Sequence, residues 1–196
     1  MFYGYPANPE TACYAVWTIW ALSWFLAAGW SDRAQTRPSL VEQLPYRVVT
    51  TGGFVLLFVF YARNYLGPLR LWVLPDAIGW AMVAMCAGAF LFAWWARIHL
   101  GRLWSGWVTK TEGHTIVDTG PYGIVRHPIY TGLITAAFAL MIVKGTVLAI
   151  AGAFFIAFGF WIKARLEERF LGEQLGAEAY DDYRKNVPML IPGGPR

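Results

Sequence analysis

The sequence predicts an all-α integral membrane protein of about five transmembrane helices, in which the fourth and fifth form a hairpin and a helical tail lies in the cytoplasm. Of the 196 residues, 57% are hydrophobic and 14% are charged, whereas a soluble domain usually has about 25% charged residues. The apolar residues also fall in long blocks, which is typical of a polytopic membrane protein. We expect one membrane domain, with the N-terminal spans in residues 1–98 and a polar loop, the hairpin and the tail in residues 99–196.

Five apolar blocks are expected to be the spans: residues 12–30, 48–66, 72–98, 129–143 and 145–163. A helix needs roughly 20 residues to cross the hydrocarbon core, and every block except the fourth has about this length. The fourth block is shorter and is joined to the fifth by Lys144 and Gly145 alone. This spacing predicts a tight helical hairpin whose first arm starts below the membrane surface.

The basic residues predict the orientation. If the N-terminus is outside, 13 of the 16 lysines and arginines fall on one side of the membrane and three on the other. Because cytoplasmic loops carry an excess of Lys and Arg, we expect a multi-pass protein whose polar loop and tail face the cytoplasm. The tail should continue the fifth helix to Gly172 or Gly176, and a short amphipathic helix, "AEAYDDYRKNV", should follow before the prolines end helix formation.

Several classes of protein are disfavoured. The block at 12–30 is preceded by Glu10 and by no basic stretch, so we do not expect a cleaved signal peptide. Cys13 and Cys86 each lie inside an apolar block, and no Cys/His cluster has metal-ligand spacing, so neither a disulfide framework nor a metal site is predicted. The net charge of +4 comes from no contiguous basic patch, so nucleic acid is not an expected partner.

The stretch "RHPIY" predicts an anion site at the start of the fourth helix. Proline is favoured at the first position of a helix, so we expect His127 to cap the helix and Pro128 to begin it. The amides of Ile129, Tyr130 and Thr131 would then be free donors at the positive end of the helix dipole. Arg126 adds a full positive charge. The alternative is that Arg126 binds lipid phosphate and His127 only caps the helix.

Two further features lie near this helix start. Lys163 and Glu167 in "KARLEE" are spaced i, i+4 and share a helix face, with Glu168 on the neighbouring face. The alternative is a set of solvated ion pairs that contribute little. The loop "GHTIVDTGPYG" holds His114, an apolar stretch and Tyr122. An anion site, a carboxylate and apolar or aromatic walls together suggest S-adenosylmethionine as a ligand.

The motifs "LGRLWS…HTIVDTGPYGIVRHPIYTG" and "RLEERFL…LG…AYDDYRKNVPMLIP" resemble the isoprenylcysteine carboxyl methyltransferases and the wider family of integral membrane methyltransferases that includes phospholipid methyltransferases. The resemblance covers roughly residues 97–192. It implies an S-adenosylmethionine pocket on the cytoplasmic side, closed by the tail. The residues that it implies as cofactor contacts are Trp107, His114, Thr115, Ile116, Val117, Tyr122, His127, Pro128, Ile129, Tyr130 and Glu167.

The resemblance also implies roles at the acceptor end. Lys163 stands where the family has a substrate-facing arginine, and Arg126 is the arginine of "RHP". As a mechanism we expect Glu167 to hold the methionyl ammonium, the helix start to hold the methionyl carboxylate, and Lys163 or Arg126 to neutralise an anionic acceptor. Glu168 is a candidate base if the acceptor is an amine or a thiol. Lys163 lacks the bidentate fork of arginine, and Asn186 and Gly123 also depart from the family pattern. These departures bear on the acceptor more than on the cofactor.

The predicted function is therefore S-adenosylmethionine-dependent methyl transfer to a lipophilic or lipid-anchored acceptor that enters from the bilayer, among membrane lipids. The nucleophile remains open between a carboxylate, an amine and a thiol. One alternative is a sterol-type reductase that uses NADPH, which Asp118 disfavours because the 2′-phosphate needs basic residues. The other is a non-catalytic membrane scaffold, which predicts that Arg126, His127 and Glu167 tolerate alanine.

Overall fold

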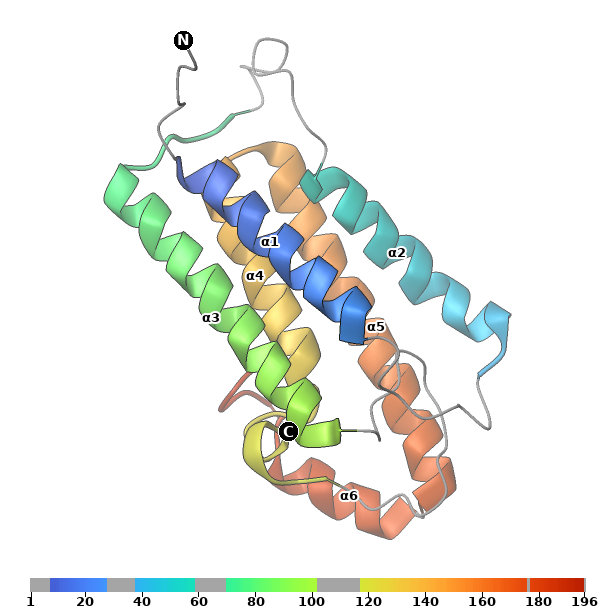
Figure 1. Ribbon diagram of the computed structural model, residues 1–196. Helices are drawn as coiled ribbons and strands as arrows, with labels where there is room; N and C mark the ends of the chain where they lie inside the picture. Colours follow the sequence, from blue (N-terminus) through green and yellow to red (C-terminus); the bar gives the residue numbers. More distant parts are fainter. Residues whose placement is uncertain (1–7, 28–37, 59–69, 102–116, 176, 196) are drawn as a thin grey trace, which may run out of the picture.

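The computed structural model describes residues 8–27, 38–58, 70–101, 117–175 and 177–195. Within these residues the predicted all-α class is confirmed. The elements are α1 (Pro9–Leu26), α2 (Leu40–Phe58), α3 (Asp76–Leu100), the short 3-10 helix η4 (Gly120–Gly123), α4 (Pro128–Lys144), α5 (Val147–Leu175) and α6 (Ala177–Asn186). The five long helices form a bundle, and α6 lies across the end of the bundle at which α5 terminates (Figure 1).

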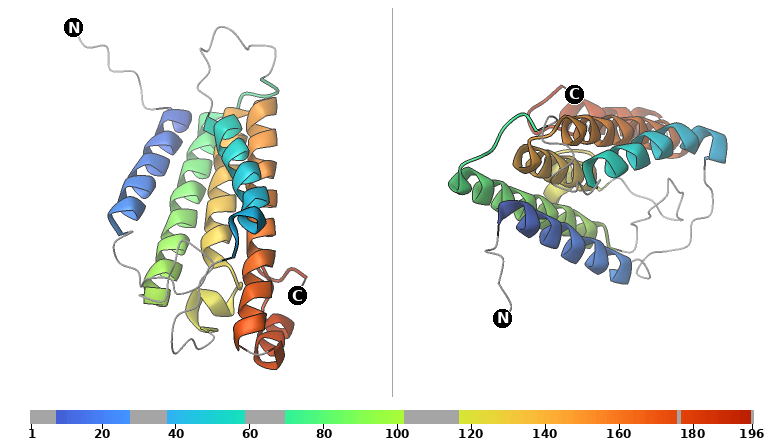
Figure 2. Two further views of the ribbon diagram at one scale, coloured as in Figure 1. Left: turned by 90° about the vertical axis from the view of Figure 1, so that its right-hand side faces the viewer. Right: turned by 90° about the horizontal axis from the view of Figure 1, so that it is seen from above.

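The bundle has α4 at its centre. This helix lies between α3 and α5, while α1 packs mainly against α3 and α2 mainly against α5 (Figure 2). The helix α4 has 17 residues, and many of its side chains are buried on all sides, from Ile129 to Val143. A helix that is apolar all round is expected in such a central position.

Two described helices are long and apolar enough to cross a bilayer, Asp76–Leu100 and the Val147–Gly172 part of α5. Large apolar side chains on the outer faces of the bundle are exposed, among them Phe25 on α1, Leu91 on α3 and Phe154 on α5. A soluble surface rarely carries so many. With the composition, these faces indicate association with a membrane.

The helix α2 begins at Leu40, eight residues before the predicted span at 48–66. Its start is set by a capping box in "SLVE". The amide of Glu42 donates to Oγ of Ser39 (3.2 Å), and the amide of Ser39 donates to Oε2 of Glu42 (2.9 Å). This reciprocal pairing satisfies two amides at the helix start, so the helix extends into polar sequence that hydropathy alone leaves out.

The hairpin between α4 and α5 turns at Gly145 and Thr146, because Lys144 is still the last residue of α4. Gly145 adopts a left-handed conformation (φ 59°), and its amide donates to the carbonyl of Met141 (2.9 Å), which is a common helix ending for glycine. The Nζ of Lys144 is buried and donates to the carbonyl of Leu57 (2.6 Å). Lys144 therefore connects the hairpin to α2 and does not form the turn.

The predicted continuation of the fifth helix into the tail is confirmed, since α5 passes through Gly172 and ends at Leu175. Gly172 does not stop the helix. The predicted short helix follows as α6 and ends at Asn186, before Pro188.

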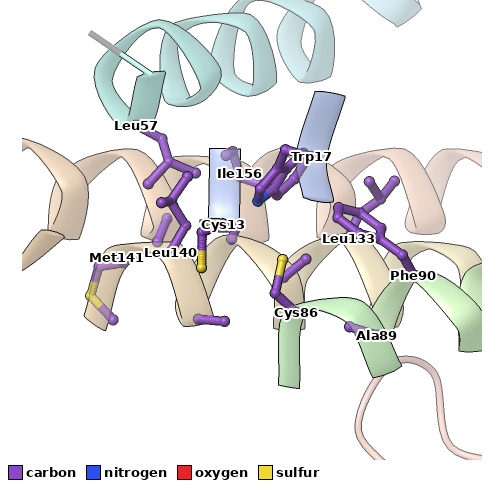
Figure 3. Close-up of a cluster of buried hydrophobic side chains, with 14 of the residues drawn as sticks. Cys13, Trp17, Leu57, Cys86, Ala89, Phe90, Leu133, Leu140, Met141 and Ile156 are labelled. Atoms are coloured by element: carbon purple, nitrogen blue, oxygen red, sulfur yellow. The ribbon is translucent and has the colours of Figure 1, made fainter. Parts of the chain in front are cut away.

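The core at the middle of the bundle is apolar and includes the thiols of Cys13 and Cys86 (Figure 3). Trp17 of α1 meets Phe90 of α3 edge to face, with ring centroids 4.7 Å apart. Leu140 of α4 is fully buried in the same cluster. Side chains from all five long helices meet in this core, and α4 contributes many of them because it lies at the centre of the bundle.

Glycines allow the backbones of α2 and α5 to approach closely. A Cβ added to Gly53 would lie 2.7 Å from the amide nitrogen of Ile156 and 2.9 Å from the carbonyl oxygen of Gly152. One added to Gly159 would clash with Oγ1 of Thr50. Small residues at helix contacts are a usual device in membrane bundles, and here they leave no room between α2 and α5.

We expect Gly53→Ala to destabilise the protein, because the added methyl group meets backbone atoms that cannot move separately. Overpacking of this kind costs about 1–3 kcal/mol, and it should appear as a lower melting temperature in detergent. The matched control is Gly52→Ala, where nothing lies within 4 Å of the added Cβ and the helix propensity of alanine should leave stability unchanged or raised. Equal melting temperatures for the two variants would contradict the close packing of α2 on α5.

Candidate active site

The candidate site lies at the end of the bundle where α4 begins, α5 extends beyond its apolar part and α6 crosses. Proline at position 128 starts α4, and His127 is its cap residue as predicted. The side chain of His127 makes no capping hydrogen bond with the helix. It points instead toward two consecutive carboxylates of α5.

Glu167 and Glu168 lie on either side of the His127 ring. The Nδ1 atom is 3.4 Å from Oε2 of Glu167, and Nε2 is 3.1 Å from Oε1 of Glu168. Because both ring nitrogens face carboxylate oxygens, both act as donors when the ring is an imidazolium. Burial disfavours the charged ring, but the hydrogen bonds and charges of the two carboxylates outweigh burial and raise the pKa of His127 above its usual value.

Arg126 is buried in the same cluster, with 3% of its side chain exposed. Its Nε donates to Oε1 of Glu168 (2.7 Å). Its Nη1 donates to the carbonyls of Arg184 (3.1 Å) and Val187. The guanidinium of Arg126 therefore joins the start of α4 to α5 and to the end of α6.

Oε2 of Glu168 is buried and accepts no hydrogen bond from the described residues. Nε of Arg184 lies 3.7 Å from this oxygen. A buried carboxylate oxygen without a donor is costly. This atom is therefore a candidate for accepting a hydrogen bond from a ligand.

The segment after α6 pairs with the start of α4 through its backbone. The amide of Arg126 donates to the carbonyl of Pro188 (2.9 Å), and the amide of His127 donates to that of Met189 (3.1 Å). The hydroxyl of Thr131 donates to the carbonyl of Leu190 (2.7 Å). Residues 187–190, which we call the tail strap, therefore cover the first turn of α4.

One expectation for this turn is wrong. The amide of Thr131 is not free, because it donates to the carbonyl of His127 (3.0 Å), as the first intrahelical hydrogen bond to a cap residue does. The amides of Ile129 and Tyr130 precede this bond. They are therefore the two predicted donors that the helix itself does not use.

Aromatic rings extend the cluster toward α5 and α2. The Tyr130 ring is parallel to the His127 ring (centroids 5.4 Å apart, 5° between planes) and stacks on Phe160 (4.9 Å). Its hydroxyl donates to Oε1 of Glu167 (2.5 Å). Nζ of Lys163 is 3.8 Å from the same oxygen and lies over the rings of Tyr130 (5.0 Å) and Tyr46 (5.7 Å).

The 3-10 helix η4 flanks the cluster. Gly120 has a positive φ of 58°, and a Cβ there would lie 2.8 Å from the His99 ring, so both the conformation and the space require glycine. His99 shares a hydrogen bond with the hydroxyl of Thr119 (2.9 Å), and its ring stacks on Tyr122 at 6.4 Å. The carbonyl of Tyr122 accepts a hydrogen bond from Tyr183 of α6 (2.7 Å).

Most of the described candidate residues come together. The structure brings into one cluster, or into the helix turn beneath it, Arg126, His127, Pro128, Ile129, Tyr130, Lys163, Glu167 and Glu168. Tyr122 lies at its flank, and Val117 packs against the apolar core. Trp107, His114, Thr115 and Ile116 lie outside the described residues. Within the described residues, no group of three or more His, Cys, Asp or Glu side chains could hold a metal ion.

Sequence reasoning missed Tyr46, His99, Arg184 and the hydroxyl of Thr131. His99 lies in the last turn of α3, just before the motif "LGRLWS", and Thr131 follows "RHPIY", so both lie close to motifs that had been singled out. Tyr46 carried no such signal. It reaches the cluster from a helix more than 100 positions away in the sequence from Lys163.

The raised pKa of His127 predicts how stability depends on pH. The stabilisation from the imidazolium is fully present below the unfolded pKa of about 6.5 and is lost as pH rises through the higher folded pKa. We therefore expect the melting temperature of the wild type to fall over this range, and that of His127→Gln to change less. The control is His99→Gln, at an exposed ring, which should keep the wild-type profile. A wild-type profile as flat as that of His127→Gln would contradict the imidazolium.

Two ion pairs of similar length allow the effect of burial to be measured. Glu168→Gln leaves Arg126 with an uncompensated charge in a buried position, which costs about 3–5 kcal/mol in comparable pairs. Glu42→Gln removes the 2.6 Å pair with Arg169, whose side chains are 58% and 43% exposed, and should change stability little because solvent screens the pair. Glutamine can keep the capping box. A melting temperature that falls equally in both variants would show that burial does not govern the cluster.

Comparison with known proteins finds similarity in the region that holds this site. Residues 81–173 match the model of the isoprenylcysteine carboxyl methyltransferase family. A methanethiol S-methyltransferase of Pseudomonas deceptionensis is 42% identical over 73 residues, which are 36% of this chain and 26% of that protein. The enzyme of the same name from Mycobacterium tuberculosis is 28% identical over 172 residues, 79% of this chain and 65% of that protein.

A protein-S-isoprenylcysteine O-methyltransferase of Schizosaccharomyces pombe is 29% identical over 115 residues, 57% of this chain and 48% of that protein. The alignments thus span less than two thirds of the length of each of these relatives. The matched region includes the start of α4 and both carboxylates of α5, which are the centre of the site. Residues 81–173 are therefore similar to the isoprenylcysteine carboxyl methyltransferase family over the part of the chain that holds the site.

Proposed function

We propose that this protein is an S-adenosylmethionine-dependent methyltransferase that acts on a lipophilic acceptor at a membrane. The observation that carries the proposal is the buried cluster of His127, Glu167 and Glu168 beneath the tail strap, inside the region that the family model matches. Isolated surface ion pairs would not explain carboxylates that are 14% and 4% exposed. Buried charges of this kind are a usual mark of a functional site.

The described residues fit the amino-acid end of the cofactor. Glu167 already accepts from Tyr130 and faces His127 and Lys163, whereas Oε2 of Glu168 accepts nothing from the described residues. We therefore propose Glu168 as the principal partner of the methionyl ammonium, next to the sequence-based candidate Glu167. The amides of Ile129 and Tyr130, at the positive end of the α4 dipole, are suited to the methionyl carboxylate.

Two aromatic residues, Tyr130 and Tyr122, are candidates to contact the cofactor. The face of an aromatic ring attracts a cation such as a sulfonium. Tyr130 is held by its hydrogen bond to Glu167 and by stacking on His127 and Phe160, so its ring is preorganised for such a contact. Tyr122, stacked on His99, is a candidate neighbour of the purine.

When bound, S-adenosylmethionine supplies an electrophilic methyl group, whose bond to sulfur breaks with the electron pair left on that sulfur as the bond to the acceptor forms. The protein has to align the acceptor and exclude water, which can contribute several kcal/mol. In this proposal the tail strap excludes water from the first turn of α4. Arg126 and Glu168 keep the strap, α4 and α5 in register, so Arg126 acts as a positioning residue and not as the partner of the acceptor.

Lys163 is then the basic residue at the acceptor end. It is a compact point charge without the bidentate fork that matches a carboxylate, and Glu167 already balances part of its charge. A thiolate needs only one such charge, because its nucleophile is a single atom. We therefore propose a lipophilic thiol, which loses its proton to solvent before transfer, as the acceptor. The methanethiol methyltransferases among the relatives agree with this choice. Labelled methyl transfer to a carboxylate and not to a thiol would contradict it.

The proposed topology has five spans with the site facing the cytoplasm. It is supported by the 13 to three distribution of basic residues and by the alignment of five long helices in one bundle (Figure 2). The helices α1, α2 and α4 would be the additional spans. No specific observation supports the alternative of a sterol-type reductase. The relatives reported above are all named as methyltransferases.

Calorimetry with S-adenosylhomocysteine tests the proposed cofactor site. We expect the wild type to bind, and Glu167→Ala and Glu168→Gln each to lose at least about tenfold in affinity, because a hydrogen bond to a charged group contributes about 1.5–3 kcal/mol. The loss should be larger for Glu168→Gln than for Glu167→Gln. Asp182→Asn, at an exposed position on α6, is the control and should bind as the wild type does. A folded wild-type sample that does not bind S-adenosylhomocysteine would refute the proposal.

A further inference from the structure

One wall of the site comes from outside the region that the family model matches. That region starts at residue 81, whereas Tyr46 of α2 is buried and has its ring beside Nζ of Lys163. We infer that Tyr46 is a specificity-determining residue, whose ring limits the size of the acceptor group that can lie next to Lys163. The inference rests on the proposed methyltransferase function and deepens its acceptor side.

The position of Tyr46 is set by one face of α2 that packs along α5. Residues 42, 46, 50 and 53 recur at the helical spacing of three to four and so share this face. Their partners on α5 follow in descending residue number, because the two helices are antiparallel. Glu42 pairs with Arg169, Tyr46 lies over Lys163 and Thr50 contacts Gly159. The glycine contacts leave no space for α2 to shift, so the Tyr46 ring cannot withdraw from Lys163 by movement of the helix.

The side chain of Tyr46 is also held in place. Its hydroxyl donates to Oε1 of Gln43 (3.2 Å), which also accepts from Nη2 of Arg47 (2.9 Å). Nε2 of Gln43 donates to the carbonyl of Pro38 (2.7 Å). The carboxamide of Gln43 is buried at 3% exposure, and turning the Tyr46 ring away would remove one of the two donors to its oxygen and leave the Tyr46 hydroxyl without this acceptor, at a cost.

The two rings around Lys163 have different surroundings. Tyr130 donates to Glu167 and is parallel to His127, so it belongs to the carboxylate cluster that we assign to the cofactor. Tyr46 makes its polar contact within α2. The neighbouring side chains Leu44 and Val48 are 58% and 61% exposed on the outside of the bundle, where the lipid would be. Tyr46 thus separates the lipid-facing side of α2 from the ammonium of Lys163, which is where an acceptor from the bilayer has to arrive.

The test compares acceptors of one nucleophile class that differ only in the bulk next to the reacting atom. For each variant, kcat/KM is measured for a slim and a bulky alkyl thiol, or for the class that the wild type methylates. Tyr46→Ala should raise the ratio of bulky to slim kcat/KM by about tenfold or more, in the range by which small changes in an apolar contact discriminate substrates. Tyr46→Trp should lower this ratio. Tyr46→Phe keeps the ring and should stay close to the wild type.

Two measurements separate this role from a structural one. Leu44→Ala, on the outer face of the same helix, should leave the ratio unchanged. The affinity for S-adenosylhomocysteine should also stay within about twofold in the three Tyr46 variants, because Tyr46 belongs to the acceptor side, and a twofold change is small on the scale of binding free energies. An unchanged ratio in folded Tyr46→Ala and Tyr46→Trp, or a parallel loss of S-adenosylhomocysteine binding, would overturn the inference. A wild type that binds no S-adenosylhomocysteine would instead refute the proposed function on which it rests.

Discussion

The burial of two adjacent carboxylates on α5 is the constraint on which the architecture at this end of the bundle depends. Glu167 and Glu168 cannot remain charged away from water without cations beside them, and Arg126, His127 and Lys163 supply these charges within 4 Å. Arg126 and His127 stand at the start of α4, so pairing them with α5 brings together the two ends of helices that the hairpin joins only at the opposite end of the bundle. Nη1 of Arg126 also donates to the carbonyls of Arg184 and Val187 in the tail. The ion pairs and the tail strap are therefore connected through Arg126.

The proposed binding of a small charged ligand follows from groups that this arrangement leaves unpaired among the described residues. The internal pairing leaves one buried oxygen, Oε2 of Glu168, without a donor among the described residues, and it leaves two amides at the start of α4 before the first intrahelical bond. A zwitterion such as the methionyl group complements both. The aromatic residues Tyr130 and Tyr46 then divide the surroundings of Lys163 into a side that faces the carboxylates and a side that faces α2. In the proposed function the cofactor is therefore held by α4 and α5, whereas the choice of acceptor depends also on α2.

Residue patterns that act locally were readable from the sequence. Pro128 marked the start of α4, the long apolar blocks predicted the bundle, and the i, i+4 pair of Lys163 and Glu167 was found as an ion pair. Features that depend on backbone carbonyls or on distant helices were not readable. The tail strap binds α4 through main-chain groups of residues 187–190. Every residue type has a main-chain carbonyl, so the sequence gives no signal for these contacts. The start of α2 was missed because the capping box of Ser39 and Glu42 lies in polar sequence. Tyr46 was missed because only the close packing of α2 on α5, made by Gly53 and Gly159, places it over Lys163.

Hydrogen–deuterium exchange with and without S-adenosylhomocysteine tests the central claim most directly, because it reports where the ligand acts without assuming which residue contacts it. The account predicts slower exchange in the first turn of α4 after Pro128, in the α5 turn that carries Glu167 and Glu168, and in the tail strap. The outer end of the bundle, around Gly145, should exchange at the same rate in both samples. Protection confined to the outer end, or none in a sample that calorimetry shows to be saturated, would contradict the claim that these segments form the cofactor site.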